Sequence, residues 1–134
     1  ARAMTVLEVD TGGREAFIDL TRRLEALAGA EGWREGALLL HCPHTTCGLT
    51  VNEGADPDVQ HDLLARLRRL APSGGGDRHA EGNSDAHLKA SLMGCGLLLP
   101  LAEGRLRLGT WQAVFLCEFD GPRRRQVWVT RLPG

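Results

Sequence analysis

The sequence predicts an α+β fold, a single domain over residues 1–134 with a mixed, largely antiparallel sheet and about three helices. Three observations lead to this prediction. The chain has 134 residues and is 43% hydrophobic, which suits one domain with one core. Its first part alternates β-rich segments with amphipathic helical ones, and its last part is a run of short apolar segments separated by turn residues. No internal repeat or linker divides the sequence.

The first predicted element is a strand at residues 4–10, because MTVLEVD alternates polar and apolar residues. The segment GGREAFIDLTRRLEALAGAEG follows and predicts an amphipathic helix between flanking glycines. The apolar stripe of this helix consists of Phe17, Leu20, Leu24 and Leu27. GALLLHC then predicts a strand that enters a buried sheet, and GLTV is either its continuation or its partner after a kink near Pro43.

A second helix is predicted in DPDVQHDLLARLRRLAP, with Asp56 as its N-cap and Pro57 at its first position. Asp56 and Asp58 are both expected at a helix start whatever the function, because acidic side chains there satisfy free amides and complement the helix dipole; for Asp58 this structural interpretation is favoured. The residues of this helix predicted to face the core are Val59, Leu63, Leu67 and Leu70. The following SGGGDRHAEGN is predicted to be a flexible loop, since it is rich in glycine and lacks the Gly-Lys-Ser/Thr ending of a P-loop.

A third, short helix is predicted in NSDAHLKASLMG and ends at Gly94. At about 100° per residue, His87 falls on a polar face of this helix while Leu88 and Leu92 turn to the core. The segments GLLLPL, LRL, TWQAVFLCEFD and RQVWVT follow, with AEGR and DGPR as turns between them. They predict a series of antiparallel strands.

The composition of the chain argues against nucleic acid and membranes as binding partners. The net charge is -1, from 16 basic and 17 acidic residues, so no overall field favours nucleic acid or an anionic membrane. No apolar run approaches the roughly 20 residues of a membrane span, and ARAMTVLEVD contains no apolar signal-peptide core. We therefore expect a cytoplasmic protein that uses neither nucleic acid nor membrane as a partner. Its four cysteines form no Cys-x-x-Cys pair, and buried, reduced thiols are the favoured interpretation.

The segment WQAVFLCEF is apolar on both faces of a strand except for Gln112 and Glu118, which share one face. Two apolar faces indicate a helix layer on one side and a neighbouring subunit on the other. A carboxylate in such a strand is costly unless it is paired, bound to metal or open to a cleft. The alternative is that Glu118 lies at the strand end and reaches solvent.

Four segments of the sequence resemble successive blocks of the YjbQ family, small proteins credited with a secondary thiamine-phosphate synthase activity. They are PHTTCGLTVNEGADPDV, RHAEGNSDAHLKASLMG, GRLRLGTWQAVFLCEFDGPR and the closing VWV. The resemblance implies a YjbQ-like α+β fold, a homotrimer with sites between subunits, and a reaction that joins an aminopyrimidine pyrophosphate to a thiazole phosphate. The polar positions of the family correspond to His44, Thr45, Thr46, Asn52, Glu53, Asp56, His79, Glu81, Asp85, His87, Lys89, Thr110, Gln112 and Glu118.

The chemistry of pyrophosphate displacement assigns expected roles to these residues. Negative charge builds on the leaving group, and a divalent cation or basic side chains must neutralise it. We predict that the catalytic residues are Glu53, Asp85 and Glu118. The predicted substrate-binding residues are Thr45, Thr46, Asn52, Lys89, Thr110 and Gln112. The predicted ligands of a divalent metal ion are His44, His79 and His87, with zinc favoured if the histidines converge and magnesium if only carboxylates do.

Two other functions compete with a synthase acting on phosphorylated small molecules. One is a metal-dependent hydrolase of phosphorylated small molecules at the same site, and the other is a non-catalytic trimer that binds a metal or ligand. Turnover of a pyrophosphorylated substrate would separate the enzymes from the binding protein. The basic run at residues 123–125 is interpreted first as a solvated strand end, although arginines there could also grip a phosphate.

Overall fold

The computed structural model of the protein describes residues 4–134, and their helices and strands follow the predicted order closely. The strands are β1 (Met4–Asp10), β2 (Ala16–Asp19), β3 (Gly36–His41), β4 (Cys47–Glu53), β5 (Gly96–Ala102), β6 (Arg105–Leu106), β7 (Gln112–Glu118) and β8 (Arg124–Leu132). The helices are α1 (Thr21–Glu31), α2 (Pro57–Leu70) and α3 (Ser84–Met93). No helix within residues 4–134 is long and apolar enough to cross a membrane.

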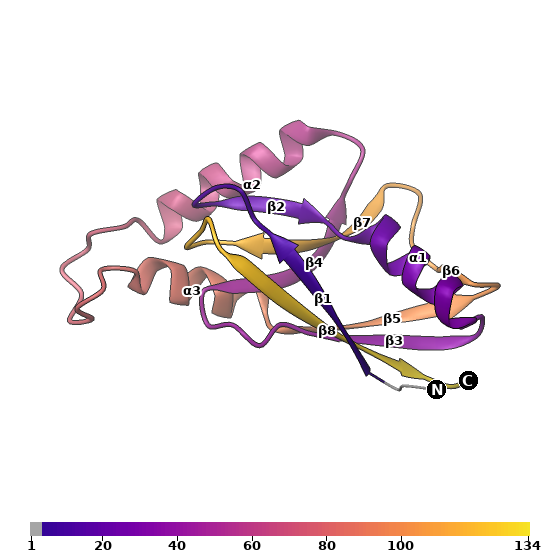
Figure 1. The fold of residues 1–134 in the computed structure, drawn as a ribbon. Helices are drawn as coiled ribbons and strands as arrows, with labels where there is room; N and C mark the ends of the chain where they lie inside the picture. The colour runs from indigo at the N-terminus through magenta and orange to yellow at the C-terminus, as the bar shows by residue number, and fades with distance from the viewer. Residues whose placement is uncertain (1–3) are drawn as a thin grey trace.

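The strands form two sheets (Figure 1). The first has five strands in the order β1-β8-β3-β5-β6, and the second has three in the order β2-β7-β4. Each strand pairing within residues 4–134 is antiparallel. The α+β prediction with three helices is therefore confirmed. The prediction of one mixed sheet is corrected, because the strands divide between two layers and every pairing among the described residues is antiparallel.

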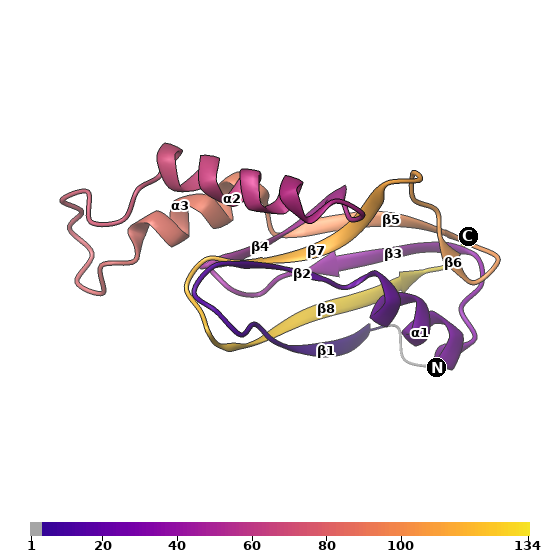
Figure 2. The ribbon, with the colours of Figure 1, turned by 90° about the horizontal axis from the view of Figure 1, so that it is seen from above.

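The main core lies between the two sheets. Leu40 and Val127 face inward from the five-stranded sheet, and Leu49 and Leu116 face them from the three-stranded one, all fully buried. Leu24 of α1 joins the same cluster, and Figure 2 shows this helix at the end of the molecule opposite α3. Removing this apolar surface from water is the main force that holds the sheets together.

Strand β7 is apolar on both faces because both faces are covered within one chain. Leu116 packs into the core between the sheets, whereas Phe115 and Cys117 on the other face pack in a second cluster with Leu67 of α2 and Ala90 of α3. A central strand between a sheet and a helix layer needs no further cover. The prediction that a neighbouring subunit covers one face of this strand is therefore wrong.

Two predictions near the N-terminal half are also corrected. The first helix begins at Thr21, because residues 16–19 form strand β2 and pair with β7, where Phe17 lies opposite Cys117. This pairing satisfies their backbone groups in a sheet rather than in a helix. The GLTV segment belongs to β4 of the three-stranded sheet, so it neither continues β3 nor pairs with it.

The predicted orientation of the third helix is wrong. In α3 the side chains of Leu88 and Leu92 are 48% and 55% exposed, while Asp85 and Lys89 are buried. The polar pair is turned inward because it takes part in an ion-pair network, described below. In α2 the N-cap is confirmed, since Asp56 Oδ1 accepts a hydrogen bond from the Asp58 amide at 2.9 Å.

Candidate functional site

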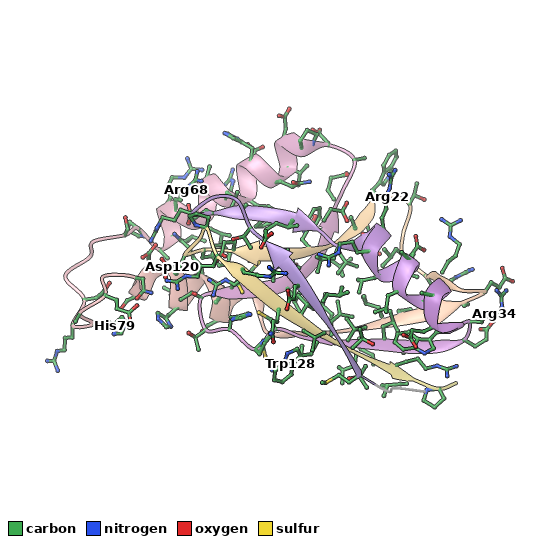
Figure 3. The ribbon with its side chains drawn as sticks, in the orientation of Figure 1. Arg22, Arg34, Arg68, His79, Asp120 and Trp128 are labelled. Carbon is green, nitrogen blue, oxygen red and sulfur yellow. The ribbon has the colours of Figure 1, made fainter. Side chains whose placement is uncertain are left out.

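A pocket of about 360 Å³ lies where the chain passes between the two sheets. The connections β1–β2, β3–β4 and β7–β8 all cross between sheets at this end, as the pairing of Ala16 and Cys47 with Glu118 and of Asp10 with Arg124 shows. Residues 43–46, the loop before α3, His87 and the start of β8 line the pocket. Figure 3 shows His79 and Asp120 at this end, and Arg22 and Arg34 toward the other.

Arg125 is the most firmly held cation of the pocket. Its Nε and Nη2 donate to the two carboxylate oxygens of Glu118 at 2.8 and 2.5 Å, and Nη2 also donates to Thr46 Oγ1 at 2.8 Å. The Arg125 side chain is 6% exposed and that of Glu118 is fully buried. These bonds use Nε and Nη2, so Nη1 is the amino group that remains for a ligand.

Glu118 is held as a carboxylate. Burial alone would raise its pKa, but the hydrogen bonds from Arg125, the Asp120 amide and Thr11 outweigh burial and lower the pKa below the ordinary glutamate value. A carboxylate with this set of donors is a poor proton acceptor. The sequence left open whether Glu118 is paired, bound to metal, open to a cleft or exposed to solvent. The structure shows it paired with Arg125, whose guanidinium it orients.

The neutral ring of His44 is fixed in one tautomer. Its Nε2 accepts a hydrogen bond from the Gln126 amide at 2.8 Å, so the neutral ring carries its proton on Nδ1. Burial lowers the pKa of His44 below the ordinary value, and the positive charge of Arg125 lowers it further. The lone pair that a metal ion would need is therefore engaged by the backbone of β8.

His79 and His87 lie next to each other, with ring centroids 5.5 Å apart in an edge-to-face arrangement. Glu81 Oε1 is 3.8 Å from His79 Nε2. The three histidines predicted as metal ligands all line the pocket. Across residues 4–134, however, no group of three or more His, Cys, Asp or Glu side chains is arranged to hold a metal ion. Metal binding by His44, His79 and His87 stays a prediction.

Asn83 and Asp120 complete the pocket, and no pattern in the sequence pointed to either as a site residue. Asn83 Nδ2 donates to Asp120 Oδ2 at 2.8 Å, and Arg123 Nη2 donates to the same oxygen at 3.1 Å. Asn83 is buried, and its Oδ1 has no hydrogen-bond partner among the described residues. An unpaired buried amide oxygen is costly, and a ligand with a donor group or a cation would satisfy it.

The basic run at residues 123–125 is only partly a solvated strand end. Arg124 is exposed and pairs with Glu8, as a solvated residue would, whereas Arg125 is 5% exposed. Strand alternation accounts for this difference, because Arg125 shares the inward face with Val127 and Val129. The alternation was the signal that could have identified Arg125 from the sequence.

Asp85 and Lys89 do not line the pocket. Lys89 Nζ lies 3.1 Å from Asp85 Oδ2 and 2.8 Å from Glu15 Oε2, and Arg14 adds a longer contact to Asp85 at 3.4 Å. Arg68 of α2 also binds Glu15, at 2.5 Å. Burial would raise the pKa of Asp85 and Glu15, but hydrogen bonds from Lys89 help to lower both. This network ties the β1–β2 connection to α2 and α3.

The remaining predicted residues lie at the opposite end of β7. Glu53 pairs with Gln112 at the far end of β7, six residues along the strand from Glu118, or about 20 Å. Glu53 Oε2 accepts from the Ala55 amide at 2.8 Å, and Asn52 Oδ1 accepts from the Glu53 amide at 2.7 Å. Gln112 and Thr110 line a separate hollow of about 310 Å³. Within one chain the predicted residues therefore fall into three groups: the pocket, the Asp85–Lys89 network and this far end of β7.

The match to known proteins extends over nearly the whole chain. A family model described as "UPF0047 protein YjbQ-like" matches residues 5–134. The chain belongs to the YjbQ family. The UPF0047 protein YugU of Bacillus subtilis is 46% identical over 127 residues, which cover 94% of this chain and 96% of that protein. A UPF0047 protein of Methanocaldococcus jannaschii is 43% identical over 91% of this chain and 88% of its own length.

Solved YjbQ-like structures share the fold. A conserved hypothetical protein of Thermus thermophilus has 56% sequence identity and a TM-score of 0.90, with 96% of this chain and 99% of that one covered. A YjbQ/UPF0047 family protein of Clostridium acetobutylicum has 43% identity and a TM-score of 0.92 at the same coverage. Membership in the YjbQ family and the α+β fold are thereby established. The names of these relatives state no reaction, so the reaction must be argued from the pocket.

Proposed function

We propose that the pocket binds the pyrophosphate or phosphate group of a small-molecule substrate. On this proposal the protein is a transferase of the thiamine-phosphate synthase kind, acting in the cytoplasm. The main support for the proposal is the guanidinium of Arg125, which Glu118 and Thr46 hold at the pocket wall. Arg123 and three histidines line the same pocket. Arginine presents a planar fork of donors that matches phosphate oxygens.

The arrangement suits the departure of pyrophosphate. Charge develops on the leaving oxygens, and donors already fixed in place stabilise that charge without having to reorganise. Arg125 is fixed by its buried ion pair and Arg123 by Asp120, through Nη2 at 3.1 Å and through Nε to the Asp120 carbonyl at 2.8 Å. Thr45 belongs to the same lining and offers a hydroxyl. The thiazole phosphate and the reacting carbon would lie farther out in the pocket.

We propose that a divalent metal ion binds in this pocket after its side chains move closer together, since within residues 4–134 no three His, Cys, Asp or Glu side chains are arranged to hold one as they lie. The pocket offers both nitrogen and oxygen donors to such an ion. They are the neighbouring imidazoles of His79 and His87, the Glu81 carboxylate and the unpaired Asn83 Oδ1. His44 could join only after its ring releases the Gln126 amide. Such an ion would supply charge neutralisation for the leaving group. Elemental analysis of protein purified without added metal should find near-stoichiometric zinc or a related ion, and magnesium binding should raise the melting temperature if zinc is not the ion.

Hydrolysis at the same pocket is the second candidate, and the pairing of His79 with Glu81 favours it. An imidazole beside a carboxylate can accept a proton from water, which is the step that a hydrolase needs. A phosphorylated small molecule would be the substrate in this case too. Non-catalytic binding of metal or ligand is the third candidate, and turnover measurements separate it from both enzymes.

We also propose a homotrimer, on a surface other than β7. The outer face of the five-stranded sheet carries exposed apolar side chains from β1, β3 and β5. They are Met4, Val6, Leu39 and Leu98, which are 47%, 41%, 41% and 63% exposed. Trp128 lies on the same face, opposite Val6 in the register (Figure 3). A trimer would also allow the pocket of one subunit to meet the far end of β7 of another, since the family resemblance implies sites between subunits.

The test of the pocket compares two neighbouring arginines. Arg123→Ala removes a charge that lines the pocket, whereas Arg124→Ala removes an exposed charge paired with Glu8. Loss of a charge-assisted hydrogen bond should weaken pyrophosphate binding about 10- to 100-fold in the first variant and leave it unchanged in the second. Equal binding by both variants would place the anion site elsewhere.

Product analysis then separates the candidate reactions. Incubation with the aminopyrimidine pyrophosphate and the thiazole phosphate should yield thiamine phosphate, with Arg123→Ala reducing the rate. Release of inorganic phosphate from either substrate alone would favour the hydrolase, and binding without turnover would favour the non-catalytic protein.

Light scattering tests the assembly. It should show a trimer at micromolar protein concentration, and Leu98→Asp should dissociate this trimer. A wild-type monomer would contradict the proposed homotrimer.

A further inference from the structure

Two thiols lie at the two ends of the loop that carries four of the pocket residues. Cys42 follows β3 and Cys47 begins β4, so the chain between them is the pocket loop, residues 43–46. Their Sγ atoms are 3.3 Å apart, and Cys42 Sγ lies 3.5 Å from the Cys47 carbonyl oxygen. Both residues are buried, at 2% and 1% exposure. The proposed reaction uses neither thiol. Packing alone does not account for the short distance between the sulfur atoms either, since a hydrophobic contact does not require two sulfur atoms to face each other.

A small solute can reach this pair from a second hollow. Cys47 lines a cavity of about 460 Å³ that His44, His87 and Cys95 also border. Cys117, by contrast, is fully buried in the cluster between β7 and the helices. Cys42 and Cys47 therefore form a close pair of thiols that can be reached from a cavity through Cys47.

We propose that Cys42 and Cys47 are a modification site that forms a reversible disulfide on exposure to hydrogen peroxide. One thiol is oxidised by the peroxide to a sulfenic acid, and one water leaves. The second thiol then attacks the sulfenic sulfur and displaces its hydroxyl group, which leaves as a second water once it has taken the thiol proton. A dithiol reductant reverses the change by thiol–disulfide exchange and is itself converted to a cyclic disulfide. Disulfides of this kind in intracellular proteins are typically transient and redox-sensing.

Formation of the bond would shift the pocket loop. A disulfide joins its sulfurs at about 2.0 Å, whereas they now lie 3.3 Å apart. The loop between them is held to β8 by the Gln126 amide on His44 Nε2 and to the end of β7 by the Phe119 amide on the Thr46 carbonyl at 3.2 Å. These two hydrogen bonds would take up the displacement. The disulfide is thus coupled to the position of His44 and Thr46 in the pocket, whatever reaction the pocket performs.

Peptide mapping of the full chain tests the bond itself. Residues 35–66 contain no lysine or arginine before Arg66, so trypsin leaves Cys42 and Cys47 in one peptide and places Cys95 and Cys117 in others. After treatment with hydrogen peroxide, this peptide should lose the mass of two hydrogen atoms and regain it with dithiothreitol. Cys95→Ser and Cys117→Ser should behave like the wild type, and Cys42→Ser should not show the loss.

Amide hydrogen exchange tests the coupling to the loop. Exchange at Gln126 and Phe119 should differ between reduced and oxidised protein, while amides in the β3–β5 pairing, such as Leu39, should not change. An unchanged peptide, a disulfide to Cys95, or oxidation that dithiothreitol fails to reverse would each overturn the proposal. A disulfide that forms with no change at Gln126 and Phe119 would overturn the coupling.

Discussion

Replacing Glu118 with glutamine tests whether this carboxylate supports the fold. The substitution preserves volume and removes the charge. In the folded protein the carboxylate accepts five hydrogen bonds, two from Arg125 and one each from Thr11 and the Phe119 and Asp120 amides. Glutamine cannot accept all five, because its amide nitrogen is a donor. The Arg125 guanidinium would also remain buried without a counter-charge.

The size of the effect follows from that unpaired charge. Breaking a buried ion pair by removing one partner costs about 3–5 kcal/mol of unfolding free energy. For a domain of this size, such a loss corresponds to a fall in melting temperature of about 10–20 °C. Glu53→Gln is the matched control, since Glu53 accepts one hydrogen bond, from the Ala55 amide, at the surface. It should lower the unfolding free energy by less than about 1 kcal/mol.

The stability of both variants is measured by thermal melting and urea denaturation. The protein concentration is kept the same throughout, because subunit assembly makes the unfolding midpoint depend on concentration. A double variant, Glu118→Gln with Arg125→Met, provides a second measurement. It should melt above the single Glu118→Gln variant, since removal of a buried pair as a whole is far less costly than removal of one partner. A melting temperature for Glu118→Gln within about 2 °C of the wild type would refute the assigned role of this ion pair.

Three further predictions concern the other charged groups. Lys89→Met leaves Asp85 and Glu15 buried without their shared cation and should lower the melting temperature by about 10–20 °C. Folding lowers the pKa of Glu118, Asp85 and Glu15, so these carboxylates contribute stability above their ordinary pKa values. That stability is lost as the pH falls, and the urea midpoint should therefore drop steeply below about pH 4.5. Folding also lowers the pKa of His44, so the unfolded chain takes up a proton on this residue at a higher pH than the folded protein does. Stability should therefore begin to decline below about pH 6.5. NMR titration should show His44 still neutral at that pH, and His44→Gln should abolish this shallow decline.

Much of the fold follows from local patterns. The strands from MTVLEVD to RQVWVT and the capped helix at Pro57 lie where alternation and capping place them. Strand β2 was missed because Phe17 and Leu20 also fit a helical spacing, and only the pairing of Phe17 with β7 shows which structure forms. The inward face of α3 was missed because an apolar residue is expected to be buried, whereas Lys89 is buried by partners on a distant loop and on its own helix.

The structure brings part of the predicted residue set together. The three histidines, Thr45 and Thr46 line one pocket, whereas Glu53 and Gln112 lie at the far end of β7. A shared strand face says nothing about separation along the strand, and here the separation is about 20 Å. Asn83 and Asp120 depend on how the loop before α3 meets the β7–β8 turn, which is a tertiary contact with no local pattern.

The pocket lies on the seam between two sheets, and this gives it a mechanical property. The β3–β4 and β7–β8 connections span the seam on either side of the pocket, and the Arg125–Glu118 pair joins the two sheets from within. Any sliding of one sheet over the other must therefore strain the pocket walls, even when it starts in the core far away. A substitution such as Leu40→Ala, which loosens the contact between the sheets, would thus misalign the pocket walls although Leu40 lines no part of them.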